Sequence, residues 1–148
     1  MLKNALYLRL SLADGDLGKN NKDESNSIEN QRTLLVNFLQ DRDDLADEYI
    51  EYVDDGYTGT NFERPEFKRM IEDAKAGKID TIIVKDFSRF GRDYLEVGFY
   101  IEYIFPLLQI RFISINDSYD SAASSGMTGG MNVALQNLIY NMYSLDLS

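Results

Sequence analysis

The sequence predicts an α/β domain: a mostly parallel sheet of four to five strands with helices on both faces. Short apolar runs alternate along the chain with segments whose apolar residues recur at helical spacing, as expected when helices connect parallel strands. Residues 81–84 are all β-branched, which is typical of a strand buried on both faces of such a sheet. The chain of 148 residues is long enough for one domain with a substantial core.

The first strand is predicted at residues 5–10, which are almost entirely apolar. The polar stretch at 14–26 is longer than most strand-to-helix connections, so we expect a functional loop there. Either Asn26 or Ser27 can cap the helix that follows, and Glu29 is positioned to complete a capping box on Asn26.

Alternating residues predict the second strand at 48–53, followed by a glycine-punctuated loop at 54–60. Pro65 suits the first residue of a second helix, which Gly77 is expected to end. Four apolar residues of this helix have the spacing of a buried face: Phe67, Met70, Ile71 and Ala74.

The strand at 81–84 is followed by a third helix, predicted at about 94–105 and ended by Pro106, and then by a fourth strand at 111–115. Residues 131–148 carry the apolar stripe of an amphipathic helix. We expect this helix either to pack on its own domain or to continue in a longer chain and pair with another subunit, and we favour the second arrangement.

Composition limits the chemistry that is available. The chain has no Cys and no His, which excludes disulfides, thiolate or imidazole metal sites and His-based triads. The net charge of −10 is wrong for a domain that holds DNA by itself, so any nucleic acid would have to be held by another segment. The sequence has neither a membrane-spanning apolar run nor a signal-peptide pattern, so we predict a cytoplasmic protein with no membrane partner.

Polar residues follow three of the predicted strands, at the ends that meet at one edge of a parallel sheet. They are Arg9 and Ser11 after the first, Asp55, Thr58 and Arg64 after the second, and Lys85, Ser88, Arg89 and Arg92 after the third. Guanidinium groups match phosphate oxygens, and a hydroxyl among them can act as a nucleophile because the cations stabilise developing negative charge. The alternative is a strand-end hydroxyl with surface ion pairs nearby.

Five short motifs resemble, in order, those of the catalytic domain of serine recombinases, the resolvase/invertase superfamily. They are Tyr-Leu-Arg-Leu-Ser at 7–11, Ser-Ile-Glu-Asn-Gln at 27–31, Asp-Gly-Tyr-Thr-Gly at 55–59, Arg-Pro at 64–65 and Ser-Arg-Phe-Gly-Arg-Asp at 88–93. The resemblance covers nearly the whole chain. The long insert after Ser11 and the block at 112–117 look most like the large serine recombinases of mobile transposons.

The resemblance implies a role for each matching residue. Ser11 would attack a DNA phosphodiester and form a 5′-phosphoseryl intermediate, before strand exchange and religation. The residues expected to bind the scissile phosphate are Arg9, Arg89 and Arg92, and Gln31, Asp55, Thr58, Arg64 and Ser88 match supporting positions. Asp55 would orient an arginine or, as the alternative, act in proton transfer. Lys85 lies outside the motifs and is added as a supporting cation because it follows the third strand. Many family members carry Asp at the position of Ser88, so the role of this position is open.

The resemblance also implies partners. The substrate would be a pair of double-stranded DNA recombination sites, bound by homodimers that join into a homotetramer, with no metal and no cofactor. Residues 1–130 would form the catalytic domain and 131–148 the start of a long oligomerisation helix, with DNA-binding domains further along a longer chain.

Two other functions are compatible with the residues alone. A flavodoxin-like module could hold a phosphorylated small ligand at the same edge of the sheet. An assembly domain without chemistry could use the last helix for oligomerisation.

Overall fold

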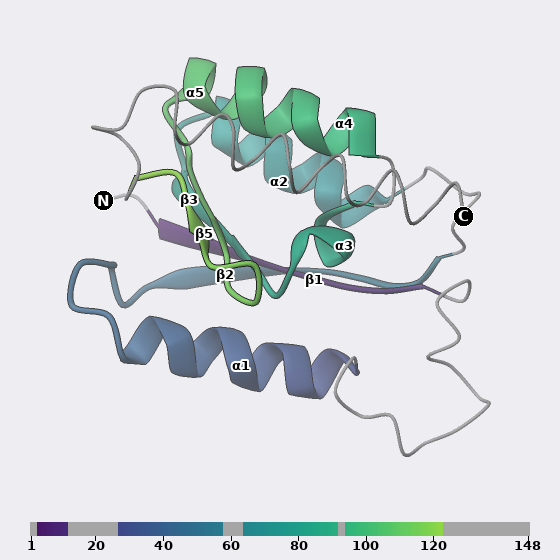
Figure 1. Ribbon diagram of the computed structural model, residues 1–148, viewed down its shortest axis with the longest axis vertical. Coiled ribbons are helices and arrows are strands. Elements are labelled where there is room, and N and C mark those ends of the chain that lie inside the picture. The colour runs from purple at the N-terminus through teal and green to yellow at the C-terminus, as the bar shows by residue number, and fades with distance from the viewer. Residues whose placement is uncertain (1–2, 12–26, 58–63, 92–93, 123–148) are drawn as a thin grey trace.

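The computed structural model describes residues 3–11, 27–57, 64–91 and 94–122, and of residues 11, 55–57 and 94 it describes the backbone only. One sheet runs through this part of the chain in the order β2-β1-β3-β4-β5 (Figure 1). Its strands are β1 (Lys3–Ser11), β2 (Tyr49–Tyr57), β3 (Ile79–Val84), β4 (Arg111–Ser114) and β5 (Tyr119–Asp120). The first four are parallel and β5 is antiparallel to β4, which confirms the predicted fold class and adds a short strand.

Helices cover both faces of the sheet, as predicted. Helix α1 (Ile28–Gln40) lies on one face. Helix α2 (Pro65–Lys75) lies on the other face, together with the helix formed by residues 94–108 (Figure 1). Side chains of a strand alternate between faces, so Leu6 and Leu8 pack with α1 while Ala5 and Tyr7 pack on the opposite side. The result is two apolar layers, one on each face of the interior strand β1.

The start of α1 settles one open prediction and overturns another. Ser27 is the N-cap, and its Oγ accepts a hydrogen bond from the amide of Asn30 at 3.1 Å. With Ser27 as the cap, the third helical position belongs to Asn30, so the capping box predicted for Glu29 is wrong. Glu29 instead pairs with Arg32 at 3.1 Å. Helix α2 does begin at Pro65, and Gly77 follows its end at a φ of +79°.

Strand β2 is longer than predicted. It continues through residues 54–57, which the sequence placed in a loop because of their turn-forming side chains. The neighbouring strand β1 supplies hydrogen-bonding partners over this stretch, pairing Arg9 with Asp54 and Leu10 with Asp55. Tertiary pairing therefore overrides local propensity.

Pro106 does not end the third helix, contrary to the prediction. The helix runs through α4 (Tyr94–Phe99), the π-helical turn η3 (Tyr100–Ile104) and α5 (Phe105–Leu108). A proline inside a regular helix lacks one amide donor and collides with a carbonyl of the preceding turn. The wider π turn, in which the Phe105 amide bonds to the Tyr100 carbonyl, gives it room. The helix ends at Gln109, whose φ is 59°.

The predicted loop at 14–26 and the predicted helix at 131–148 lie outside the described residues, so the division at residue 130 stays a prediction. Among the helices that the structure describes, none combines the length and the apolar character needed to cross a membrane.

Candidate active site

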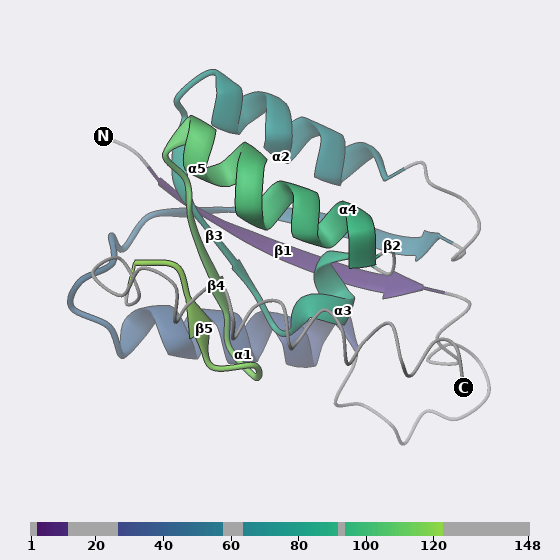
Figure 2. The same ribbon diagram turned by 45° about the horizontal axis from the view of Figure 1, so that its top comes forward.

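The candidate site lies at the carboxyl edge of the sheet, where β1 ends and β3 turns into the short helix α3 (Phe87–Phe90) (Figure 2). Arg9 and Arg89 meet there, and their exposed fractions are only 4% and 6%. Arg9 donates from Nε to the Arg89 carbonyl at 3.2 Å and from Nη2 to the Ser88 carbonyl. Arg89 donates from Nη1 to the Arg9 carbonyl at 3.2 Å. The two arginines thus hold each other's backbone.

These contacts satisfy the end of α3. A four-residue helix leaves its carbonyl groups without partners inside the helix, and these oxygens carry partial negative charge. The Gly91 amide donates to the Phe87 carbonyl at 3.1 Å, and Arg9 donates to the carbonyl groups of Ser88 and Arg89. Arg64 donates from Nη1 to the Phe90 carbonyl. Arginines from β1 and from the start of α2 therefore fix the position of α3.

Carboxylates satisfy the other end of α3. Asp86 is the N-cap, and its Oδ1 accepts hydrogen bonds from the Arg89 amide at 2.9 Å and from Ser88 Oγ at 2.6 Å. Asp117 accepts from the Phe87 amide at 2.8 Å. The Ser88 side chain is exposed and bonds this cap, while its carbonyl receives Arg9.

Gln31 reaches the site from α1 and is fully buried. Its Nε2 donates to the Arg9 carbonyl at 2.9 Å, and its Oε1 accepts from the Arg9 amide at 3.2 Å. The pairing of β1 with β3 reaches only Leu6, opposite Ile83, whereas its pairing with β2 continues to Ser11. Gln31 supplies partners for both backbone groups of Arg9 and holds the end of β1 in place.

Ser11 is the last residue of β1, two positions after Arg9, and it pairs with Tyr57 of β2. Asp55 pairs with Leu10, so its backbone lies at the same edge. Of both predicted site residues the structure describes the backbone only. Thr58 and Arg92 lie outside the described residues.

Arg64 and Lys85 lie beside α3. Besides the Phe90 carbonyl, Arg64 bonds Glu96 of α4 at 3.0 Å, and its guanidinium stacks 4.3 Å from the centre of the Phe67 ring. Lys85 is buried at the junction of β3 and α3, where its carbonyl accepts a hydrogen bond from the Asn116 amide at 2.8 Å. Both residues support the turn that carries Arg89.

Sequence reasoning missed Asp54, which is fully buried. Its Oδ2 accepts hydrogen bonds from the Tyr7 hydroxyl at 2.8 Å and the Phe67 amide at 3.0 Å, and its Oδ1 accepts from the Glu66 amide at 3.1 Å. Asp54 therefore caps α2 from the neighbouring strand, because the N-cap residue Arg64 does not cap it. Burial, together with the carboxylate, raises the pKa of Tyr7 well above its usual range.

One signal could have pointed to this cap. The helix predicted to begin at Pro65 is preceded by Arg64, which is a poor capping residue, so a cap from elsewhere in the chain was to be expected. Within the part of the chain that the structure describes, no cluster of three or more acidic side chains is arranged to hold a metal ion.

The fold and this edge of the sheet define an α/β domain of the resolvase type. The chain belongs to the resolvase family, because its sequence matches the model "Resolvase, N terminal domain" over residues 4–142. Membership confirms the predicted resemblance and makes the chain a recombinase catalytic domain, of the class that acts in site-specific recombination. It supports the recombinase interpretation over the flavodoxin-like binding module.

Solved structures agree with this assignment. The chain is similar to the N-terminal catalytic domain of TP901-1 integrase, with 24% identity and a TM-score of 0.68, covering 99% of this chain and 98% of that one. It is similar to a resolvase family site-specific recombinase from Streptococcus pneumoniae, with 26% identity, a TM-score of 0.66 and coverage of 99% and 92%. It also shares its fold with the C-terminal catalytic domain of ISC1926 TnpA, an IS607-like serine recombinase, at 17% identity, a TM-score of 0.54 and coverage of 93% and 96%. The comparison with curated proteins gave no match.

Proposed function

We propose that this domain cuts and rejoins DNA at recombination sites, with Ser11 as the nucleophile. One observation carries the proposal. Two arginines are buried and hydrogen-bonded to each other at the end of β1, and Ser11 is the next residue but one along that strand. Guanidinium groups keep their positive charge at physiological pH and match the geometry of phosphate oxygens, so this edge suits an anion such as a DNA phosphate.

The reaction is a transfer of a phosphoryl group between two oxygens. Ser11 Oγ loses its proton and bonds to phosphorus, while the bond from phosphorus to the 3′ oxygen breaks and that oxygen takes up a proton. The products are a 5′-phosphoserine and a free 3′ hydroxyl. Religation is the reverse attack by a 3′ hydroxyl, and the covalent link conserves the energy of the broken bond, so no high-energy cofactor is needed.

The other predicted residues have supporting roles. Arg9, Arg89 and Arg92 bind the phosphate and stabilise the charge that develops in the transition state, which removes the need for a metal ion. Gln31 holds Arg9 in place through both of its backbone groups. Asp55 orients an arginine, and the remaining supporting residues are Thr58, Arg64, Lys85 and Ser88.

We further propose that the chain comes from a recombinase of the transposon type. The insert after Ser11 and the block at 112–117 support this assignment. The substrates are two duplex recombination sites, held by a homotetramer made of two dimers. Because the net charge is −10, tight DNA binding depends on domains other than this one.

Trapping of the covalent intermediate tests the proposed chemistry. The protein is incubated with duplex DNA carrying its recombination site, the reaction is stopped in detergent, and protein–DNA adducts are separated on a gel. Ser11→Ala is expected to abolish the adduct, because alanine has no oxygen that can bond to phosphorus. Ser121→Ala, which removes a hydroxyl that accepts a hydrogen bond from the Phe112 amide at 2.9 Å near the start of β4, is the matched control and keeps the adduct. An undiminished adduct from folded Ser11→Ala protein would refute the proposal.

A further inference from the structure

The chain after β4 runs alongside the segment that leaves β3 and is bonded to it residue by residue. The Ile115 amide bonds the Val84 carbonyl at 3.1 Å, and the Asn116 amide bonds the Lys85 carbonyl at 2.8 Å. The next contact is made by a side chain: Asp117 Oδ2 accepts a hydrogen bond from the Phe87 amide at 2.8 Å. Asp117 is thus the point at which the sheet meets the first residue of α3.

The carboxylate of Asp117 is itself held in place. The hydroxyl of Ser114, which is fully buried in β4, donates to the same Oδ2 at 2.7 Å. A tight turn surrounds Asp117, because the Ser118 amide bonds the Ile115 carbonyl at 3.1 Å and Ser118 has a φ of 54°. The side chain therefore has little freedom to follow α3 if α3 moves.

Asp117 and the N-cap Asp86 act on α3 in different ways. Asp86 belongs to the turn and bonds the Arg89 amide, so it fixes the internal shape of the turn. Asp117 follows the neighbouring strand β4 and bonds the Phe87 amide, so it fixes where the turn lies relative to the sheet. Catalytic groups lose much of their effect when displaced by about 1 Å, so the location of Arg89 matters as much as its presence.

We propose that Asp117 is a positioning residue for α3, which carries Arg89 to the end of β1. It acts with Ser114, and it holds the start of α3 while Arg9 and Arg64 hold the other end. The link to catalysis rests on the function proposed above, whereas the effect on the turn does not.

Amide hydrogen exchange measured by NMR tests the positioning directly. Asp117→Ala is expected to raise the exchange rates of the amides at 87–91 about tenfold relative to those of β1, because the turn loses its bond to the sheet. Asp117→Asn keeps an acceptor oxygen at the same place and is expected to restore slow exchange. Ser114→Ala is expected to give a smaller increase. Asp73→Ala, which removes a carboxylate that accepts the Tyr52 hydroxyl far from α3, is the control and leaves 87–91 unchanged.

Unchanged exchange at 87–91 in Asp117→Ala, or equal exchange in the Ala and Asn variants, would overturn the proposal. The rate of adduct formation with pre-bound DNA then separates the positioning from the chemistry. If adduct formation is slower in Asp117→Ala and restored in Asp117→Asn, with unchanged DNA affinity, both the positioning by Asp117 and the catalytic role of Arg89 are supported. If the amides at 87–91 exchange faster but adduct formation is unchanged, Asp117 still positions α3, and the result counts against the proposed role of Arg89.

Discussion

Arg9 combines two tasks in one side chain. Two of its guanidinium nitrogens hold carbonyl groups of α3, and its own backbone is held by Gln31 and Arg89. A lysine has a single terminal nitrogen and cannot reproduce the planar fork that reaches two neighbouring carbonyls. The same residue thus supplies charge next to Ser11 and fixes the helix that brings Arg89.

At the residue scale, Asp54 is expected to contribute strongly to stability, although it belongs to none of the sequence motifs. Asp54→Ala removes the cap of α2 and leaves the buried Tyr7 hydroxyl without its acceptor. We expect the free energy of unfolding to fall by about 2–4 kcal/mol, measured by urea denaturation. Tyr7→Phe, which removes only the hydroxyl, is expected to cost about 1 kcal/mol. A loss below about 0.5 kcal/mol for Asp54→Ala would show that the cap is unimportant.

Asp54 also marks the limit of what the sequence could predict about the site. The order and spacing of the motifs led to Arg9, Arg89 and Gln31, and the structure brings these three into contact. Asp54 and Asp117 act through backbone amides of segments that are distant in sequence. The local sequence shows at most that a cap is missing, as at Arg64, and not which distant residue supplies it.

Elements were predictable where hydrophobic periodicity dominates and less so where tertiary contacts decide. The buried face of α2 follows the expected spacing because only one side of that helix meets the sheet. The predicted end of β2 and the predicted helix end at Pro106 were wrong. At the end of β2 the neighbouring strand β1 supplied hydrogen-bonding partners. At Pro106 a π turn within the helix made room for the proline ring.

The end of the helix at Gln109 gives a prediction at the scale of an element. Gln109 has a φ of 59°, a left-handed conformation that residues with a Cβ adopt at a cost. Gln109→Gly is expected to raise the free energy of unfolding by about 0.5–1 kcal/mol, measured by chemical denaturation. Gln109→Ala keeps the Cβ and serves as the control, with little or no gain expected. Destabilisation by the glycine variant would argue against a left-handed residue at this position.

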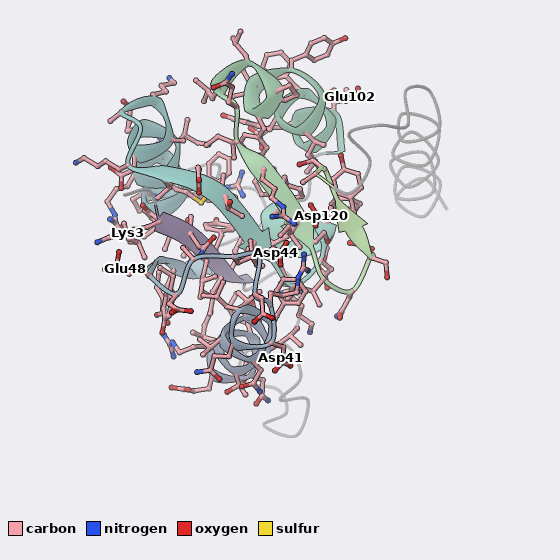
Figure 3. All side chains as sticks on the ribbon, turned by 90° about the vertical axis from the view of Figure 1, so that its left-hand side faces the viewer. Lys3, Asp41, Asp44, Glu48, Glu102 and Asp120 are labelled. Carbon is pink, nitrogen blue, oxygen red and sulfur yellow. The ribbon has the colours of Figure 1, made fainter. Side chains whose placement is uncertain are left out.

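At the scale of the whole molecule, the two edges of the sheet differ in their charges. The amino edge carries a network of ion pairs around Arg111, which bonds Asp120 at 2.7 Å and Asp44 at 2.9 Å, and Figure 3 shows both aspartates close together. Hydrogen bonds from Arg42 and Arg111 lower the pKa of Asp44. Burial of Asp120 acts in the opposite direction, yet the hydrogen bonds from Arg111 and the Ala122 amide, together with the charges of Arg111 and Arg42, outweigh it and lower that pKa too.

These shifts predict how stability depends on pH. A lowered carboxyl pKa stabilises the fold above the ordinary Asp value of about 4, and the contribution is lost as the pH falls below it. Burial raises the pKa of Tyr7, Tyr52 and Tyr119, so their contribution is present below the ordinary Tyr value of about 10 and is lost as the pH rises above it.

The chain contains no His, so we expect the free energy of unfolding to be nearly flat between about pH 5 and pH 9 and to fall on both sides. Urea denaturation at a series of pH values measures this profile. Tyr52→Phe is expected to make the alkaline decline shallower. A transition centred near pH 6 or 7 would contradict the assignment of the titrating groups.

The most direct measurement of the central claim is to identify the residue that becomes linked to DNA. The trapped protein–DNA adduct is digested with protease and nuclease, and the peptide that carries the remaining nucleotide is sequenced by mass spectrometry. We predict a phosphodiester on Ser11, in a peptide that also contains Arg9 when the protease does not cut after arginine. A nucleotide attached to any other serine or to a tyrosine would show that the nucleophile does not lie at the end of β1 beside the two arginines, and the proposed mechanism would be wrong.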